Sequence, residues 1–415
     1  MKPSVWAFAL LSMTSTAFAG PAGDTLKDAL YAGALTDGLA KLEPMAAGGD
    51  TEAAFGVGAL KLTQTVEHFV QALYRHGFAV PRTDSMFGPG FDVPIPQNPN
   101  PEPMDYAKVR DVLADLVAGA DAARVSFVAA GQSGDYVIDI NPLKIRVDAN
   151  GDDKVDISES LGNLFAVISN TPLDDLLAPP VPGGPSKFEY VGFDRADAFW
   201  LAGYTQVIAA QADFLLAHDF SDFVNALFHR LFPKAGFPMQ DYAMGGMLML
   251  DPQTDTGIAD LIAGIHTINW PVVEPARLAG VRERLKAVLD FSHQNWDAIM
   301  GETDSDHELL PSPKQTAMFP DTSVDAAKVA AWLVTLEQAR KVLDGELLIP
   351  HWRFKQGFDL KAYFETAKRT DLVMLLTGAG ALPFIKDGQV ARPEDFRDIQ
   401  DAFGNDWLGY AFWFN

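Results

Sequence analysis

Apolar residues recur at spacings of three and four along most of this chain, which is the pattern of helices with one buried face. The clearest example is the segment 55–73, where six apolar residues follow that spacing. The same spacing predicts helices within residues 109–120, 220–231, 278–288 and 329–343. The pattern therefore predicts a mainly α-helical protein.

Strand-like alternation of apolar and polar residues is confined mostly to the region 136–147. Two stretches there, Tyr136–Ile140 and Leu143–Val147, both alternate and predict short strands. An apolar run at Leu161–Ile168 has the composition of a helix. We therefore expect a minor β element beside a strand-loop-helix unit in an otherwise helical fold.

Proline and glycine mark two interruptions in the pattern. Residues 81–104 contain seven prolines, which predicts a long irregular segment. Residues 179–185 read PPVPGGP and are typical of a linker. We place a domain boundary at this linker. The prediction is an N-terminal helical region at 20–178 and a C-terminal helical domain at 186–415.

Residues 148–159 read DANGDDKVDISE and carry the most specific chemical signal in the chain. Oxygen-bearing side chains stand at positions one, three, five, nine and twelve of this stretch, and the spacing resembles the calcium loop of the EF-hand family. Calcium prefers six to eight oxygen ligands at about 2.3–2.6 Å. The resemblance implies a Ca²⁺ site whose backbone carbonyl ligand at position seven is Lys154 and whose side-chain ligands are Asp148, Asn150, Asp152, Asp156 and Glu159.

The loop departs from the family at position six, where Asp153 replaces the usual glycine. This position takes a positive φ, and Asp tolerates that conformation better than most residues. The alternative is a solvated acidic turn that binds no metal. A second complete loop is missing, because the nearest candidate begins at Asp304 and has Ser312 and Gln315 where ligands should recur. A lone loop favours a structural clip over a calcium switch.

The N-terminus has the pattern of a secretory signal peptide at residues 1–19. Lys2 supplies the positive end, Val5–Met13 the apolar core and Ala17–Ala19 the cleavage site. A chain without cysteine forms no disulfide bonds. We expect a periplasmic or secreted protein.

The charge balance narrows the class of partner. A formal net charge of −23 argues against binding nucleic acid or anionic membrane. Outside the signal peptide, no stretch of about 20 uninterrupted apolar residues is present to span a bilayer. The expected partner is the calcium ion, with no nucleic acid and no membrane span, and the sequence leaves any protein or small-molecule partner unknown.

A polar cluster at 302–308, ETDSDHE, offers an alternative chemistry. Its Asp304, Asp306, His307 and Glu308 side chains include the ligand types of a metal-dependent hydrolase. A zinc-protease HExxH motif is absent, because the second histidine is missing and Pro311 would end the helix. The hydrolase hypothesis requires these side chains to converge in one cleft, with His266 or His293 as candidate partners.

The stretches 199–233 and 266–315, with the ending GYAFWFN, resemble segments of an uncharacterised family of exported bacterial proteins. This resemblance implies no activity. Two functional classes stay open: a calcium-stabilised binding or scaffold protein of the cell envelope, and an exported metal-dependent hydrolase. Catalytic residues are not predicted.

Overall fold

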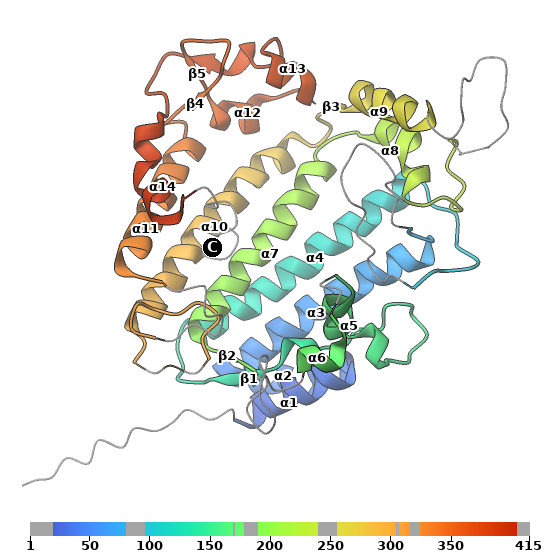
Figure 1. Ribbon diagram of the computed structural model, residues 1–415, viewed down its shortest axis with the longest axis vertical. Helices are drawn as coiled ribbons and strands as arrows, with labels where there is room; N and C mark the ends of the chain where they lie inside the picture. The colour runs from blue at the N-terminus through green and yellow to red at the C-terminus, as the bar shows by residue number, and fades with distance from the viewer. Residues whose placement is uncertain are drawn as a thin grey trace, which may run out of the picture.

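The computed structural model describes most of the chain and is mainly α-helical, as the hydrophobic pattern predicts (Figure 1). The predicted signal peptide, the linker 179–185 and the aromatic ending all lie outside the described residues. No helix in the described part of the chain is long and apolar enough to cross a membrane. The described residues are 20–79, 96–168, 171–177, 190–239, 255–303, 305, 307–315 and 324–404.

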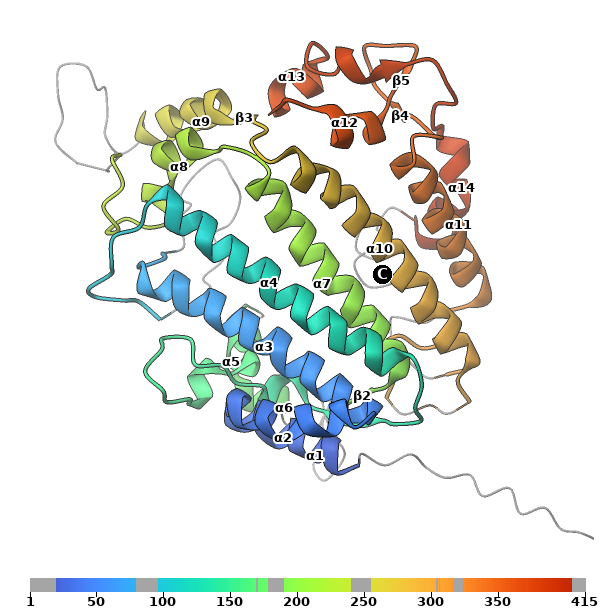
Figure 2. The ribbon, with the colours of Figure 1, turned by 180° about the vertical axis from the view of Figure 1, so that it is seen from behind.

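Four long helices lie side by side in the order α3, α4, α7, α10 and form the centre of the molecule (Figures 1 and 2). Neighbouring helices in this row run antiparallel, so that the end of α3 lies beside the start of α4. Apolar periodicity predicted at least part of α3, α4 and α10, but it did not predict α7. Their bounds are Thr51–Arg75 for α3, Tyr106–Gly131 for α4, Arg195–Leu216 for α7 and Pro275–Gly301 for α10.

Glycines allow α3 and α4 to approach closely. A Cβ atom on Gly58 of α3 would lie 2.7 Å from the Phe127 ring of α4. A Cβ atom on Gly119 of α4 would lie 2.2 Å from the Thr65 hydroxyl of α3. Both distances are shorter than van der Waals contact, so these two crossing points require glycine.

Aspartate caps fix where three of these helices begin. The carboxylates of Asp50, Asp105 and Asp194 accept N–H groups from the first turns of α3, α4 and α7. Each bond satisfies a donor that has no partner within the helix. The positions at which these helices begin therefore depend on residues that are neighbours in the sequence.

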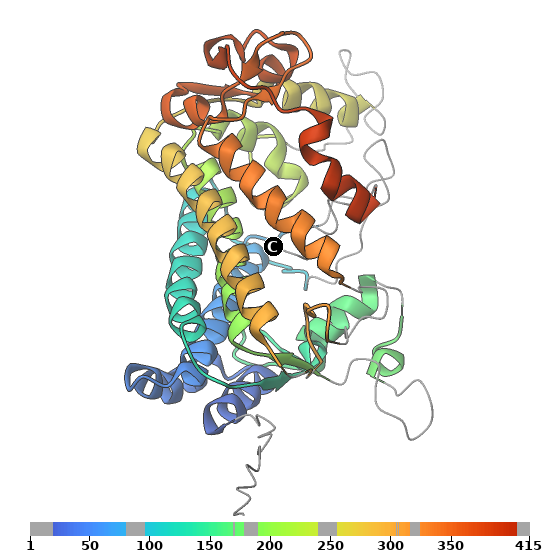
Figure 3. The ribbon, with the colours of Figure 1, turned by 90° about the vertical axis from the view of Figure 1, so that its left-hand side faces the viewer.

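Shorter helices flank the row at both edges (Figures 1 and 3). α1 (Pro21–Ala32) and α2 (Leu35–Ala47) pack against α3, and α11 (Ala326–Leu343) packs against α10. α14 (Arg397–Phe403) packs against α11. The remaining helices are α5 (Leu161–Ile168), α6 (Leu173–Leu177), α8 (Ser221–Leu227), α9 (Asp255–Thr267), α12 (Leu360–Thr366) and α13 (Leu372–Thr377).

The described strands are short and antiparallel. β1 (Ile138–Ile140) pairs with β2 (Val191–Phe193), with Asp139 opposite Gly192. The predicted strand at Tyr136–Ile140 is thus confirmed in its second half. The other pairs are β3 (Asn269–Pro271) with β6 (Arg369–Asp371), and β5 (Gly357–Phe358) with both β4 (Ile349–Pro350) and β7 (Ile385–Lys386).

The predicted strand at Leu143–Val147 is wrong. Residues Pro142–Lys144 form a 3₁₀ turn, and Arg146 makes only an isolated bridge to Ser160. The Asn141 side chain accepts the N–H of Leu143, and proline has no N–H and a fixed φ. These two local effects favour a turn over the extended conformation that the alternation predicts.

The largest hydrophobic core joins elements from both sides of the predicted linker. It includes Phe55 of α3, Phe127 of α4 and Ile138 of β1, together with Phe199 of α7 and Phe291 of α10. The N-terminal region and the C-terminal domain that we predicted therefore share this core. Two further cores, around Trp296 and around Leu278, lie along the other side of α10.

Candidate functional site

The predicted calcium loop, residues 148–159, lies against α3. The Glu67 carboxylate accepts the backbone N–H of Asp148 at 2.8 Å, and the Gln71 amide donates to the Asp148 carbonyl at 2.8 Å. Both peptide groups of the first loop residue are thus held by one helix face. The run predicted to follow the loop is confirmed as helix α5.

The first half of the loop wraps around the carboxylate of Asp148. This carboxylate accepts N–H groups from Gly151 at 2.7 Å, Asp152 at 3.3 Å and Asp153 at 3.0 Å. Asp153 has a φ of +60°, so position six has the positive φ that the EF-hand loop requires. An aspartate therefore adopts the conformation for which the family uses glycine.

The other ligand-type side chains also turn back onto the loop. The Asn150 side-chain oxygen accepts from Asp152 N–H at 2.8 Å, and Asp152 accepts from Lys154 N–H at 3.0 Å. Asp156 accepts from the N–H of Ser158 at 2.7 Å. Hydrogen bonds from Ser158 lower the pKa of Asp156, so this exposed carboxylate stays ionised.

Glu159 closes the loop from its last position. Its two carboxylate oxygens accept the N–H groups of Ala149 at 3.1 Å and Asp156 at 3.2 Å. Burial raises the pKa of Glu159, and the negative charges of Asp148 and Asp156 add to this effect. Burial likewise raises the pKa of Glu67, and the negative charges of Asp148 and Glu159 add to this effect. The loop and α3 thus concentrate negative charge around Asp148.

The loop acids do not already form a tight cage. No three of them have ligand oxygens that all lie within 4.8 Å of one another. The reason is that their oxygens are directed at backbone N–H groups. A bound cation has to draw these carboxylates together, and its charge would compensate for the mutual repulsion.

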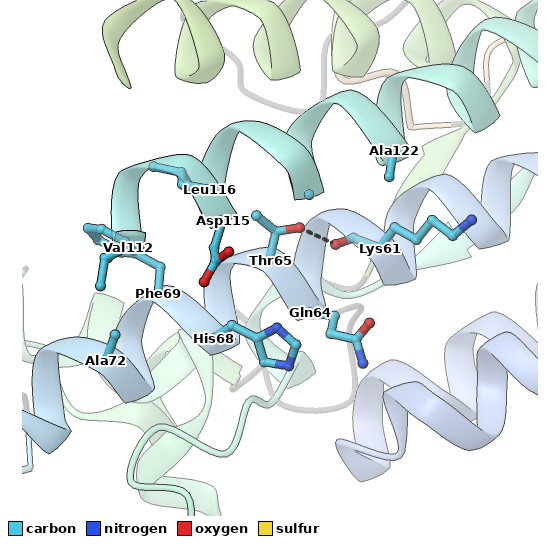
Figure 4. A pocket seen from close by; sticks show the side chains of 11 residues that line it. Lys61, Gln64, Thr65, His68, Phe69, Ala72, Val112, Asp115, Leu116 and Ala122 are labelled. Atoms are coloured by element: carbon cyan, nitrogen blue, oxygen red, sulfur yellow. Dashed lines mark hydrogen bonds between the residues drawn. The ribbon is translucent and has the colours of Figure 1, made fainter. Parts of the chain in front are cut away.

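A polar pocket of about 390 Å³ gives access to the loop. Asp148 and Asp153 line it from the loop, and Glu67 and His68 line it from α3. His68 also borders a second pocket of about 250 Å³ between α3 and α4, which Asp115 of α4 lines from the opposite helix (Figure 4). The first residue of the loop is itself buried and lies in the wall of this acidic pocket.

A second acidic site lies at the end of α10, and it joins two residues of the predicted 302–308 cluster to Asp194, which the sequence did not connect with them. One carboxylate oxygen from each of Asp194, Glu302 and Glu308 lies within 4.8 Å of the other two. Asp194 caps α7, Glu302 follows α10, and Glu308 lies in the next loop. Asp197 completes the group, because its buried carboxylate accepts the N–H of Asp194 at 3.1 Å.

A single amide spans two of these carboxyl groups. The Gln315 side chain donates to Glu302 at 3.0 Å and to Glu308 at 3.1 Å. Burial raises the pKa of Glu302 to about 8, with the charge of Asp194 as the next cause. Burial also raises the pKa of Asp197 well above its ordinary range. At neutral pH the cluster therefore holds protons, which relieve the repulsion between its carboxylates.

The predicted polar cluster at 302–308 is divided by the fold. Glu308 joins the buried carboxyl group, whereas the ring of His307 lies 4.2 Å from that of Tyr190. Asp304 and Asp306 lie outside the described residues. Among the described residues, neither His266 nor His293 belongs to a group of three potential metal ligands. The cluster 302–308 signalled one half of this site, and the D-x-x-D spacing of Asp194 and Asp197 was a signal for the other half that the sequence analysis did not use.

The comparisons with known proteins give no family for this chain. No family model matches it, and no curated protein and no solved structure is significantly similar to it.

Proposed function

We propose that this chain is an exported calcium-binding protein of the cell envelope, in which residues 148–159 hold one structural Ca²⁺. Lys154 supplies a carbonyl, and the side-chain ligands are Asp148, Asn150, Asp152, Asp156 and Glu159. The observation that supports this proposal most directly is the positive φ of Asp153, together with the three N–H groups that point at Asp148. The loop thus has the backbone turn on which EF-hand coordination depends.

Calcium would stabilise the region by neutralising the loop. The twelve residues contain five acidic side chains and one lysine. Because Glu67 and Gln71 hold the first loop residue on α3, fixing the loop also fixes α5 relative to that helix. This coupling is what a structural clip requires, and it fits a binding or scaffold protein.

The contacts of Val155 favour a structural calcium site made of one loop without a second, paired loop. In paired EF-hands the residue at position eight lies between two loops. Here a Cβ atom on Gly33, at the end of α1, would lie 2.7 Å from Val155. The side chain of Val155 therefore packs on the C-terminal end of α1. Helix α1 takes the place of a partner loop.

The test is calcium titration by calorimetry on the chelator-treated mature protein, with parallel melting curves. We expect one equivalent to bind and the melting temperature to rise. Asp148→Ala and Glu159→Ala should remove both effects, whereas Asp135→Ala, an exposed acid outside the loop, should retain them. No heat and no shift at millimolar calcium would overturn the proposal.

A second candidate function is an exported metal-dependent hydrolase centred on the buried carboxyl group. The observation that favours it is the convergence of Asp194, Glu302 and Glu308 within 4.8 Å. We expect this activity only if a divalent metal displaces the protons of the cluster. Hydrolysis of a nitrophenyl phosphate or ester in the presence of Mn²⁺ or Zn²⁺, and its loss in Glu308→Gln, would support this function. Equal rates in both proteins would exclude it.

A further inference from the structure

A large cavity is lined by residues of α10, α11, α12 and the segment 391–400, and it shares no residue with either acidic site. Figures 1 and 3 show where these elements lie. Its volume is about 690 Å³, which is within the usual range of about 300–1,000 Å³ for small-molecule sites. Leu289 lines the cavity and packs against both cores that flank α10. The cavity thus lies between these two cores, with Ile399 of one and Leu343 of the other in its lining.

The lining is almost entirely apolar. Twelve of the fifteen lining residues are aliphatic, proline or phenylalanine, among them Leu289, Val342 and Phe396. Thr335 and Gln400 are polar without charge, and the lining contains no acidic side chain. Such a surface offers few hydrogen bonds to water and favours an apolar occupant.

One charged residue, Arg392, borders this cavity. Its side chain is exposed and belongs to the capping turn before Pro393, and it forms no ion pair in the part of the chain that the structure describes. The arginines of α10 differ, because Arg277, Arg282 and Arg284 each bind carboxylates. In a chain of net charge −23, an unpaired guanidinium beside an apolar cavity is complementary to an anionic group.

We propose that this cavity binds a small amphiphile with an apolar chain and a single carboxylate head, the chemistry of a fatty acid. The carboxylate would pair with Arg392, and the chain would lie against Leu289, Val342 and Phe396. This proposal is independent of calcium binding, because the cavity shares no residue with the loop or with the acidic cluster.

The first test is a series of straight-chain carboxylates from octanoate to dodecanoate, titrated by calorimetry into the delipidated mature protein. Each added methylene that is buried should tighten binding about fourfold until the cavity is filled. The alcohol of the same length should bind about fivefold more weakly, because it lacks the ion pair. Equal affinities across the series would contradict an apolar cavity as the site.

Four variants locate the binding. Arg392→Gln should weaken dodecanoate about fivefold and leave dodecanol unchanged. Arg397→Gln is the matched control, because Arg397 is exposed on the same segment but does not line the cavity. Ala339→Phe should fill the cavity and abolish binding of both compounds. Thr335→Phe, one turn earlier on α11, repeats this test in case the first variant does not fold.

Three results would overturn the proposal. One is dodecanoate binding that neither cavity-filling variant reduces. Another is a dimer in solution that Ala339→Phe dissociates, which would make a second copy the occupant. The third is a difference between the intact chain and a triple variant. In this result the intact chain binds no amphiphile, but the variant with Trp407→Ser, Trp413→Ser and Phe414→Ser binds one. In that case the occupant is the chain's own aromatic ending.

Discussion

The loop at 148–159 and the cluster around Glu302 both gather acidic side chains, but they compensate the charge in opposite ways. In the loop, three of the five acids are exposed, and four of the five accept N–H groups from the backbone of the loop itself. In the cluster, Asp197 and Glu308 are 5% and 6% exposed and their neighbours are other carboxyl groups. The first arrangement can keep its charges, whereas the second has to bind protons.

The pKa directions follow from this difference. Hydrogen bonds from Ser158 lower the pKa of Asp156 in the loop, whereas burial raises the pKa of Glu302 in the cluster to about 8. Proximity of acids therefore does not by itself indicate a metal site. The deciding quantity is how much solvent and how many N–H groups each carboxylate keeps.

The largest expected effect is on the pH dependence of stability in the cluster. Because the folded-state pKa of Glu302 is raised, its contribution is fully present below about pH 4.5 and is lost as the pH rises to about 8. Glu302→Gln mimics the protonated form and removes this loss. At pH 8.5 the variant should be more stable than the native protein by on the order of 3 kcal/mol, with a much smaller difference at pH 4.5. Urea unfolding at both pH values measures the difference.

The matched control for this prediction is Asp297→Asn, which changes an exposed carboxyl group on the same helix. It should leave the pH dependence unchanged. If Glu302→Gln were instead less stable than the native protein at pH 8.5, an ionised Glu302 that holds a cation would be the better description of the cluster.

The next largest effect concerns the loop and depends on calcium rather than on pH. At a calcium concentration one hundred times the dissociation constant, binding should add about 2.7 kcal/mol to the free energy of unfolding. Asp148→Asn should remove most of this increment, because the first ligand loses its charge. Urea unfolding with calcium and with chelator measures it. An equal calcium-dependent increase in the free energy of unfolding of Asp148→Asn would mean that the ion binds at another site.

Gly33→Ala tests whether α1 supports the loop. Gly33 has a φ of +68°, and an added Cβ atom would lie 2.7 Å from Val155. We expect a loss of about 1–2 kcal/mol, together with weaker calcium binding. Gly49→Ala separates backbone strain from the clash with Val155. Gly49 also has a positive φ, +95°, but an added Cβ atom there would have no atom within 4 Å. If both variants leave calcium binding unchanged, the contact with Val155 has no role in the site.

The smallest expected effect comes from the residue at position six. Asp153→Gly relieves an aspartate with a φ of +60° and should stabilise the calcium-free protein by about 0.5–1 kcal/mol. It should also tighten calcium binding. Lys154→Gly, at the neighbouring residue without a positive φ, should destabilise slightly. A thermal melt of both variants distinguishes relief of strain from a general effect of glycine.

Much of the helical fold was predictable from spacing alone. The apolar periodicity at 55–73 lies within α3, and that at 278–288 lies within α10. The positive φ at Asp153 was also predicted, because it depends on the local turn. The strand at Leu143–Val147 was wrong, since alternation does not account for the turn that Asn141 and the following proline impose.

The sequence by itself determined the features that depend on neighbours along the chain. These are the helices with their aspartate caps, and the turn of the loop around Asp148. Only the tertiary structure decided which distant groups meet. It brought Asp194 to Glu302 and left a cavity between two cores along α10. The physical reason is that local hydrogen bonds fix a short segment, whereas burial and carboxyl pairing depend on how whole helices pack.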